Sequence, residues 1–248
     1  MQFLVLLYAD ESTMPVPGTV DFERDMVGFA AFGEVASGAI VAGVALEQRS
    51  TARTVCHVGD SVEVVARTFA ETDETLGGLY VLEAVSMEGA LAMARHLPVA
   101  IYGTVEVRPL GQWFDRSTTM SGLSHGASPG PARYLATIHG PESTTVGAGA
   151  VNGADSPDND PAAHQRFAHA ATDLIIAGGA LHPSPSAATI RVRDGALQIS
   201  EGGFPATDTA RALYIMGGTS EAVIEMATHI PVVAGGGVEL RPVMELDS

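Results

Sequence analysis

Lysine is absent from this chain, and basic residues of any kind are scarce. All thirteen basic residues are arginine, against twenty-nine acidic residues, so the formal net charge is −16. Schiff-base chemistry and a lysine general base are therefore excluded. Nucleic-acid binding needs a basic surface that displaces counterions from phosphates, and an anionic membrane surface would repel this charge. We expect neither nucleic acid nor membrane as a partner.

Cysteine, long apolar runs and metal-binding motifs are also missing or nearly so. The single cysteine, Cys56, cannot form an internal disulfide and fits a reducing compartment. The longest apolar run, around residues 39–46, is too short to span a bilayer, and residues 3–8 lack the basic start and the length of a signal peptide. The cysteine content and the lack of a signal peptide lead us to expect a cytoplasmic protein. No metal-ligand spacing occurs in the sequence, so we expect no metal, and we expect no cofactor.

The chain contains one sequence pattern that occurs twice. Four landmarks recur in the same order, and they pair as residues 3–8 with 134–139, 68–72 with 203–207, 96–98 with 229–231, and 103–110 with 237–243. The last pair reads GTVEVRPL and GVELRPV. An ordered recurrence of this kind predicts two copies of one supersecondary unit, able to pack as a pseudo-symmetric dimer within one chain.

Hydrophobic periodicity and turn residues predict the elements of each copy. In the first copy we expect helices at residues 21–37 and 87–96, and strands at residues 3–8, 40–46, 54–58, 62–65, 79–84 and 104–108. In the second copy we expect helices at residues 162–176 and 220–229, and strands at residue 134 onward, 187–192, 197–200, 212–216 and 238–241.

This order predicts an α+β fold of two ferredoxin-like βαββαβ repeats, packed sheet to sheet as an intrachain dimeric α/β barrel with a central cavity. The first repeat covers residues 1–114 and the second covers residues 132–248. The Ser/Gly/Pro-rich residues 115–131 form the linker. The polar, Gly-rich residues 142–161 form an inserted loop, either a lid over the cavity or a surface loop.

Several motifs resemble the YCII-related family, specifically its DGPF branch. The motifs that carry the resemblance are residues 189–195 (TIRVRDG), 201–204 (EGGF), 69–72 (FAET), 76–80 (LGGLY) and 105–109 (VEVRP). The resemblance implies the dimeric α/β-barrel fold, and an enzymatic role suspected from an acid–histidine pair. The sequence departs from the family pattern at two motif positions. The family's motif Asp falls on Ala66 and Glu201, and its motif Glu is retained as Glu71 but replaced by Ala206 in the second copy.

Eight histidines in a chain without lysine are the natural proton carriers near neutral pH. His57 lies in an apolar strand on the same face as Val55, and His139 stands at the strand end where the first copy has Tyr8. The predicted catalytic residues are His57, His139, Glu71 and Glu201. The predicted substrate-binding residues are Arg67, Tyr8, Phe69 and Phe204. The alternatives are structural histidines, solvated acids and a surface arginine. Two further pairs, Glu106 with Arg108 and Glu239 with Arg241, are expected to form cross-strand ion pairs.

These residues predict a cofactor-independent enzyme with acid/base chemistry, an isomerase, cyclase or lyase. Its substrate would be a small molecule, aromatic or polyketide-like, held in the central cavity of a monomer or homodimer. One alternative is a non-catalytic ligand-binding or regulatory module. Another is a tandem vicinal-oxygen-chelate protein, which would need two histidines and one or two carboxylates that converge on a metal.

Overall fold

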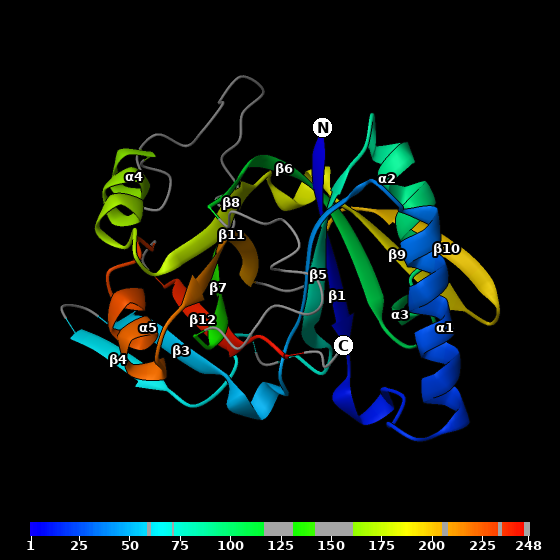
Figure 1. Cartoon of the computed structure of the whole chain (residues 1–248), viewed down its shortest axis with the longest axis horizontal. Coiled ribbons are helices and arrows are strands. Elements are labelled where there is room, and N and C mark those ends of the chain that lie inside the picture. The colour runs from blue at the N-terminus through cyan, green and yellow to red at the C-terminus, as the bar shows by residue number, and fades with distance from the viewer. Residues whose placement is uncertain are drawn as a thin grey trace.

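The structure is a computed structural model, and it describes residues 1–58, 61–70, 72–116, 131–141, 161–204, 208–232 and 235–245. Within these residues the fold is α+β, and every strand pairing is antiparallel. Strands occupy the middle of the molecule and helices lie on its two outer sides (Figure 1).

The first half of the chain supplies six strands and three helices among its described residues. In chain order they are β1 (Gln2–Ala9), α1 (Val20–Val35), β2 (Ile40–Ala45), β3 (Arg53–Val58), β4 (Ser61–Val65), β5 (Thr75–Glu83), α2 (Met87–Ala94), α3 (Val99–Tyr102) and β6 (Thr104–Asp115). These agree with the elements expected for the first copy, except that the short helix α3 was not expected and that β6 continues into the segment expected to be linker. Residues 117–130 of that segment lie outside the described residues.

The second half follows the same order of long elements. They are β7 (Arg133–Pro141), α4 (Pro161–Ala170), β8 (Ile175–Leu181), β9 (Ala188–Arg193), β10 (Ala196–Glu201), β11 (Asp208–Gly217), α5 (Ser220–Ala227) and β12 (Gly237–Pro242). The expected helix at residues 162–176 is too long, because the chain leaves it after Ala170 and enters β8. Gly178 explains why this strand can pack closely, since a Cβ there would lie 2.6 Å from the Tyr214 ring. The expected loop at residues 142–160 lies outside the described residues.

Three of the helices begin at a hydroxyl residue that caps their first turn. The side chains of Thr19, Ser86 and Thr219 accept hydrogen bonds from backbone N–H groups of α1, α2 and α5. Each of these helices also carries an acidic residue in its first turn, where it favours the positive end of the helix dipole. These local signals fix where the helices start, and hence which apolar face they turn toward the strands.

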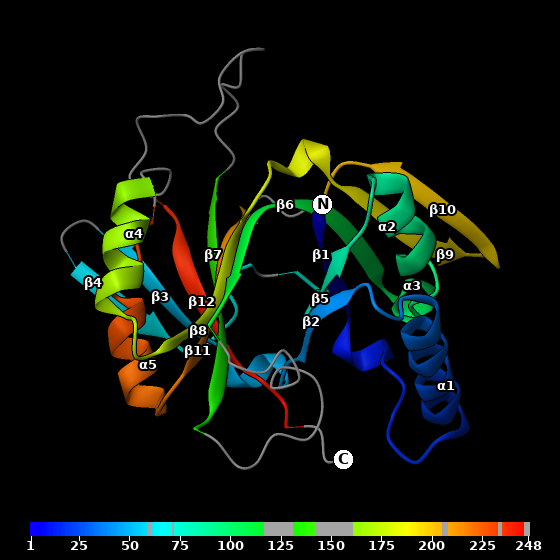
Figure 2. The ribbon, with the colours of Figure 1, turned by 45° about the horizontal axis from the view of Figure 1, so that its top comes forward.

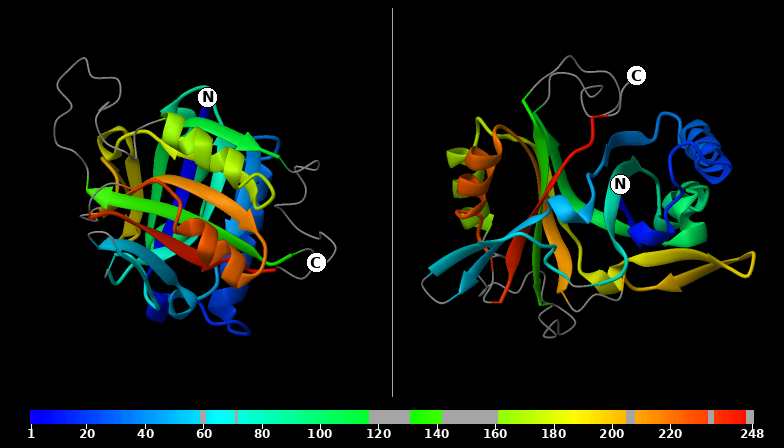
Figure 3. Two further views of the ribbon diagram at one scale, coloured as in Figure 1. Left: turned by 90° about the vertical axis from the view of Figure 1, so that its left-hand side faces the viewer. Right: turned by 90° about the horizontal axis from the view of Figure 1, so that it is seen from below.

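The two halves exchange hairpins. The strands pair in the order β2-β5-β1-β6-β8-β11-β7-β12-β3-β4, while β9 pairs with both β10 and β6. The β3–β4 hairpin of the first half therefore extends a sheet of the second half, and β9–β10 extends a sheet of the first. Figure 3 shows the two hairpins projecting on opposite sides of the molecule. An isolated bridge joins Leu46, which follows β2 at one end of the strand order, to Val243, which follows β12.

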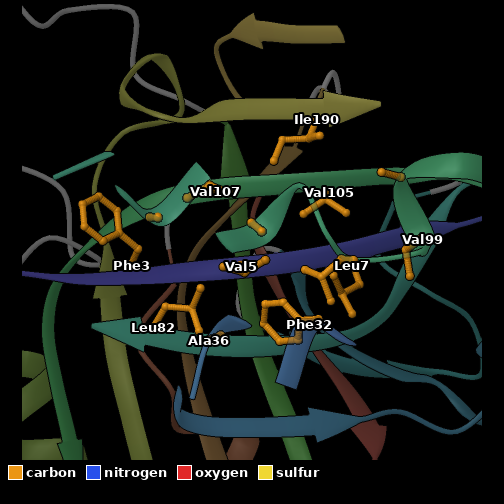
Figure 4. Close-up of a cluster of buried hydrophobic side chains, with 14 of the residues drawn as sticks. Phe3, Val5, Leu7, Phe32, Ala36, Leu82, Val99, Val105, Val107 and Ile190 are labelled. Carbon is orange, nitrogen blue, oxygen red and sulfur yellow. The ribbon is translucent and has the colours of Figure 1, made fainter. Parts of the chain in front are cut away.

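Three apolar clusters fill the described structure. One lies under α1, α2 and α3, and it includes Ile190 from the exchanged β9 (Figure 4). Another lies under α4 and α5, and it includes Val55 from the exchanged β3. The third lies between the helical sides seen in Figure 2, and it contains Leu4 and Leu6 of the first half with Leu135 of the second. This shared cluster makes the burial of each half depend on the other.

We predict that Leu135→Ala destabilises the whole chain. Leu135 is fully buried in the shared cluster. Its truncation should lower the free energy of unfolding by about 2–5 kcal/mol, in one transition seen equally by circular dichroism, which reports both halves, and by the fluorescence of Trp113 in β6. Urea unfolding followed by circular dichroism and tryptophan fluorescence measures this, with Val85→Ala as the control because Val85 is 91% exposed. Two separate transitions, with only one shifted, would contradict a shared core.

Candidate functional site

Polar side chains of the first half enter the shared cluster from β1 and β6. Opposite residues of an antiparallel pair lie on the same sheet face. In this register Leu6 faces Glu106, Leu4 faces Arg108, and Tyr8 faces Thr104. Since Leu4 and Leu6 belong to the shared cluster, Glu106 and Arg108 also point into the centre of the molecule.

The second half repeats this arrangement on β7 and β12. Leu135 faces Arg241, Thr137 faces Glu239, and His139 faces Gly237. Leu135 belongs to the shared cluster, so the same alternation places His139 and Glu239 on the central face. The positions taken by Tyr8 and Thr104 in the first half are therefore taken by His139 and Gly237 in the second.

Each buried glutamate binds the backbone of the other half. Glu106 Oε2 accepts a hydrogen bond from the Phe204 N–H at 2.7 Å. Glu239 Oε2 accepts one from the Phe69 N–H at 2.8 Å. Phe204 follows the exchanged β9–β10 hairpin, and Phe69 follows the exchanged β3–β4 hairpin. Each carboxylate thus holds, against its own half, the segment that follows the hairpin donated by the other half.

The aromatic rings held in this way stack on the two residues that differ between the halves. Phe204 stacks on Tyr8 with ring centroids 4.6 Å apart and planes inclined by 10°. Phe69 stacks on His139 at 5.0 Å and 16°. Gly237 makes room for Phe69, because a Cβ there would lie 2.7 Å from its ring. The orientation of the His139 imidazole is therefore set by a residue that Glu239 holds.

The arginine partners of the two glutamates are not equivalent. Arg108 binds Glu106 Oε1 through Nε at 2.6 Å and Nη2 at 2.5 Å, and both side chains are almost fully buried. Arg241 Nη1 lies 3.6 Å from Glu239 Oε1, and Nε of Arg241 is buried without a hydrogen-bond partner among the described residues. Burial lowers the pKa of Arg241, while the carboxylates of Glu239 and Glu11 oppose that shift. The second ion pair is looser than the first.

A small cavity lies between the two stacked pairs. Its volume is about 40 Å³, room for about three water molecules. Both halves line it, and the residues are Tyr8, Thr68, Ala70, Thr72, Glu74, Thr75, Leu76, Glu106, Arg108, Thr137, His139, Phe204, Ala210 and Glu239. The lining thus combines charged and hydroxyl side chains with aromatic and apolar ones.

An open groove adjoins this cavity. Its volume is about 400 Å³, and it shares Thr68 and Thr72 with the cavity. The remaining lining residues are Arg49, Ser50, Ala66, Arg67 and Asp73. A groove of this size falls within the range of small-molecule sites.

A further network closes the first-half side of the cavity. The Thr104 hydroxyl donates a hydrogen bond to Glu74 Oε2, and Arg191 Nη2 lies 3.3 Å from the Glu74 carboxylate. The Arg191 guanidinium also lies over the Phe204 ring, 5.8 Å from its centroid. Burial raises the pKa of the Tyr8 phenol above its usual value, and Glu106 raises it further. Tyr8 is therefore a neutral hydrogen-bonding group at ordinary pH.

The structure gathers only part of the residue set predicted from sequence. His139, Tyr8 and Phe204 line the cavity, Arg67 lines the groove, and Phe69 stacks on His139. Glu71 lies outside the described residues.

His57 and Glu201 are not brought to the cavity wall. The register pairs Val55 with Val238 and Cys56 with Gly237, so His57 shares the face of Val55, which packs beneath the helices. His139 is on the opposite face because strand side chains alternate. Glu201 is exposed at the end of β10. The expectation that these histidines and acids surround one volume does not hold for His57 and Glu201.

The expected cross-strand ion pairs are also corrected. Glu106 and Arg108 are neighbours on one face of a single strand, as are Glu239 and Arg241, and each pair is buried. Sequence reasoning missed Glu74, Thr137 and Glu239 as lining residues. The repeated motif contained a signal for this burial. Val105 and Val107 pack in the cluster under the helices, so strand alternation turns Glu106 and Arg108 toward the opposite face of the sheet, at the centre of the molecule.

Neither a metal centre nor a membrane span emerges from the parts of the chain that the structure describes. No group of three or more His, Cys, Asp or Glu there is arranged to hold a metal ion. Among those same residues, none of the helices combines the length and apolar character needed to cross a bilayer.

The fold and the site together define an α+β protein with a small cavity that both halves line. A profile of the YCII-related domain matches residues 1–114. An uncharacterized protein of Rhizobium meliloti (strain 1021) is 34% identical over 114 residues, which cover 44% of this chain and 92% of that protein. The chain belongs to the YCII-related family.

Two solved structures give weaker likenesses. A candidate chlorite dismutase is 7% identical with a TM-score of 0.40, covering 98% of this chain and 94% of its own. An anthrone oxidase-like protein is 11% identical with a TM-score of 0.30, covering 98% and 91% respectively.

We predict that Glu106→Gln destabilises the chain more than Glu239→Gln. The amide oxygen can still accept the phenylalanine N–H, so each substitution chiefly removes the charge opposite the buried arginine. Loss of one partner of a buried pair costs about 3–5 kcal/mol, and the tighter Glu106–Arg108 pair should lie at the upper end. Urea unfolding measures both, with exposed Glu63→Gln as the control. Equal losses, or the reverse order, would refute the inequivalence of the two pairs.

Proposed function

We propose that the chain is an intrachain dimeric α/β barrel of two YCII-related repeats, residues 1–114 and 132–248. The repeated order of elements, the reciprocal exchange of hairpins and the two glutamate–phenylalanine contacts support this. So does the Leu46–Val243 bridge, which brings the end of β2 in the first repeat against the end of β12 in the second. In such a barrel the cavity lies at the junction of the two repeats, and residues of both repeats line it.

We propose further that the cavity is the site of cofactor-independent proton transfer on a small molecule, with His139 as the acid/base group. The observation that carries the proposal is the placement of His139. Among the lining residues it is the one whose ordinary pKa lies near neutrality, and its ring stacks on Phe69 at the cavity wall. Oriented acid/base groups in clefts of this kind are typical of proton-transfer sites.

The other lining groups have complementary roles in this proposal. Glu106 and Glu239 hold the two phenylalanine loops, so they act as positioning residues. The neutral Tyr8 phenol can donate a hydrogen bond to an oxygen that gains negative charge. His139 would take a proton from the substrate and return it at another position, which is an isomerisation or, with loss of a leaving group, an elimination. No electron acceptor is required, because the proton is the only species exchanged.

Cavity size restricts how the substrate would lie. A volume of about 40 Å³ admits the reactive end of a molecule and excludes an aromatic ring with substituents. The body of an aromatic or polyketide-like substrate would occupy the adjoining groove, which is about ten times larger at 400 Å³. We therefore propose that the substrate spans groove and cavity across Thr68 and Thr72.

A non-catalytic ligand-binding module is the second candidate. It is favoured by the motif position that is Ala66 in the first half and an exposed Glu201 in the second, so neither half brings that acid to the cavity. On this alternative His139 contributes affinity without moving a proton.

We predict that the protein catalyses exchange of solvent deuterium into a bound carbon acid, and that His139→Gln abolishes it. The measurement is proton NMR in deuterium oxide with a panel of enolisable ketones, lactones and hydroxy acids. Removal of a general base should slow exchange by about 10²–10⁴-fold. His229→Gln, at an exposed histidine beyond α5, is the matched control and should exchange like the parent.

If a compound of the panel binds without deuterium exchange, and this binding is lost in His139→Gln, the protein is a ligand-binding module and the enzyme proposal is wrong. Exchange at the parental rate in a folded His139→Gln protein would refute the assignment of the base. Thermal unfolding establishes that each variant is folded.

A further inference from the structure

The outer strand of one exchanged hairpin has a free edge among the described residues. β10 pairs with β9, and no other described strand pairs with it. All six of its residues are exposed, and it lies at the outer margin of the molecule (Figure 2). Its register with β9 runs from residue 196 to residue 201 without a bulge. β10 is therefore a regular edge strand, the kind of element to which another strand can add.

The pairing with β9 determines which backbone groups of β10 point outward. The N–H of Gly202 donates a hydrogen bond to the Ala187 carbonyl at 2.8 Å. Residue pairs along an antiparallel ladder alternate between hydrogen-bonded and non-hydrogen-bonded. The even-numbered residues of β10 therefore direct their N–H and C=O groups toward β9. Those of residues 197, 199 and 201 point away from β9, where a new strand can pair with them.

Two of these residues also carry the large apolar side chains of the strand. Leu197 is 45% exposed and Ile199 is 51% exposed. In the register with β9 they lie opposite Val192 and Ile190, and Ile190 is fully buried in the cluster under α1, α2 and α3. Leu197 and Ile199 thus extend the apolar face of that cluster onto the exposed edge of the sheet.

β10 lacks the features that ordinarily keep edge strands from pairing. Such strands commonly carry charged residues or proline. The outer strand of the other exchanged hairpin, β4, has Glu63 at its centre. β10 has no proline, and its one charged residue is Glu201 at its end. In a chain with a net charge of −16, this neutral strand is a surface where two copies can meet with little repulsion.

β10 is also complementary to itself. When two copies pair antiparallel about a two-fold axis at Gln198, Leu197 of each copy lies opposite Ile199 of the other. Both residues have outward backbone groups, so this register makes them hydrogen-bonded pairs. Glu201 falls opposite Gly195 of the other copy, and hence no like charges face each other across the pair. A two-fold contact of this kind closes after two chains.

We propose that two copies of this chain form a homodimer by antiparallel pairing of their β10 strands. The pairing continues the interface between the two halves, because β9 of the same hairpin already joins the second half to β6 of the first. This inference goes beyond the proposed function and does not depend on it. A contact through one short strand is small, so the dissociation constant should be on the order of 10–100 µM.

Sedimentation velocity of the full chain over a range of concentrations measures the association. At about 0.15 M salt, which screens the repulsion between acidic copies, we expect the parent to pass from monomer to dimer as its concentration rises. Ile199→Lys should weaken dimerisation at least about tenfold, because its ammonium would face the apolar Leu197 of the other copy. Circular dichroism establishes that the variant is folded.

Val64→Lys is the matched control. Val64 is 45% exposed in β4 and lies opposite the buried Val55, as Ile199 lies opposite the buried Ile190. The two substitutions thus place the same charge at corresponding positions of the two exchanged hairpins. Val64→Lys should dimerise like the parent.

Amide hydrogen exchange of the parent identifies the paired edge without any substitution. The N–H groups that point away from β9 gain a partner in the dimer, so the amides of Leu197 and Ile199 should exchange about tenfold more slowly once the dimer prevails. The amides of Ala196, Gln198 and Ser200 point toward β9 in both states, and their exchange should change little.

A parent chain that stays monomeric at every concentration would overturn the proposal. So would a dimer that folded Ile199→Lys leaves intact, or that Val64→Lys weakens as much as Ile199→Lys does, since another surface would then hold it. A dimer in which the two sets of β10 amides respond alike, or in which neither responds, would equally contradict pairing through this edge.

Discussion

A buried carboxylate that accepts the backbone N–H of a phenylalanine from the opposite half is the contact on which the rest of the structure depends. It occurs twice, from Glu106 to Phe204 and from Glu239 to Phe69. A buried charge is stable only when it is paired and hydrogen-bonded, so each glutamate also needs its arginine. Because the phenylalanines end the exchanged hairpins, these contacts couple hairpin exchange, ring stacking and cavity shape.

The two halves share this strand arrangement but differ in the side chains that they present to the cavity. In the first half Tyr8 stacks on Phe204, and Thr104, Glu74 and Arg191 fill the surrounding space with a hydrogen-bonded ion pair. At the matching strand position the second half has Gly237, over which the Phe69 ring lies. There His139 stands in place of Tyr8, and its imidazole is part of the cavity wall. The two halves therefore differ locally, because the cavity wall carries a phenol from one half and an imidazole from the other.

The sequence predicted the helices and most strands because their signals are local. Thr19, Ser86 and Thr219 mark helix starts, and apolar alternation marks the strands. It failed at β8, whose apolar start continues the pattern of the preceding helix. For the site, position at a strand end identified His139 as a candidate, and strand alternation already placed His57 on the face of Val55. Hairpin exchange was not predictable, because it depends on which half each hairpin pairs with, and so the partners of Glu106 and Glu239 were not either.

Amide hydrogen exchange of Phe69 and Phe204 tests the central contact most directly. Amides in loop segments ordinarily exchange through small local openings, whereas amides in the core exchange only through global unfolding. If Glu239 and Glu106 hold these two N–H groups in a buried site, both should be protected to the level of the amides in β1 and β7. Exchange of either amide at the rate of an unprotected loop, in a protein whose strands stay protected, would contradict the account.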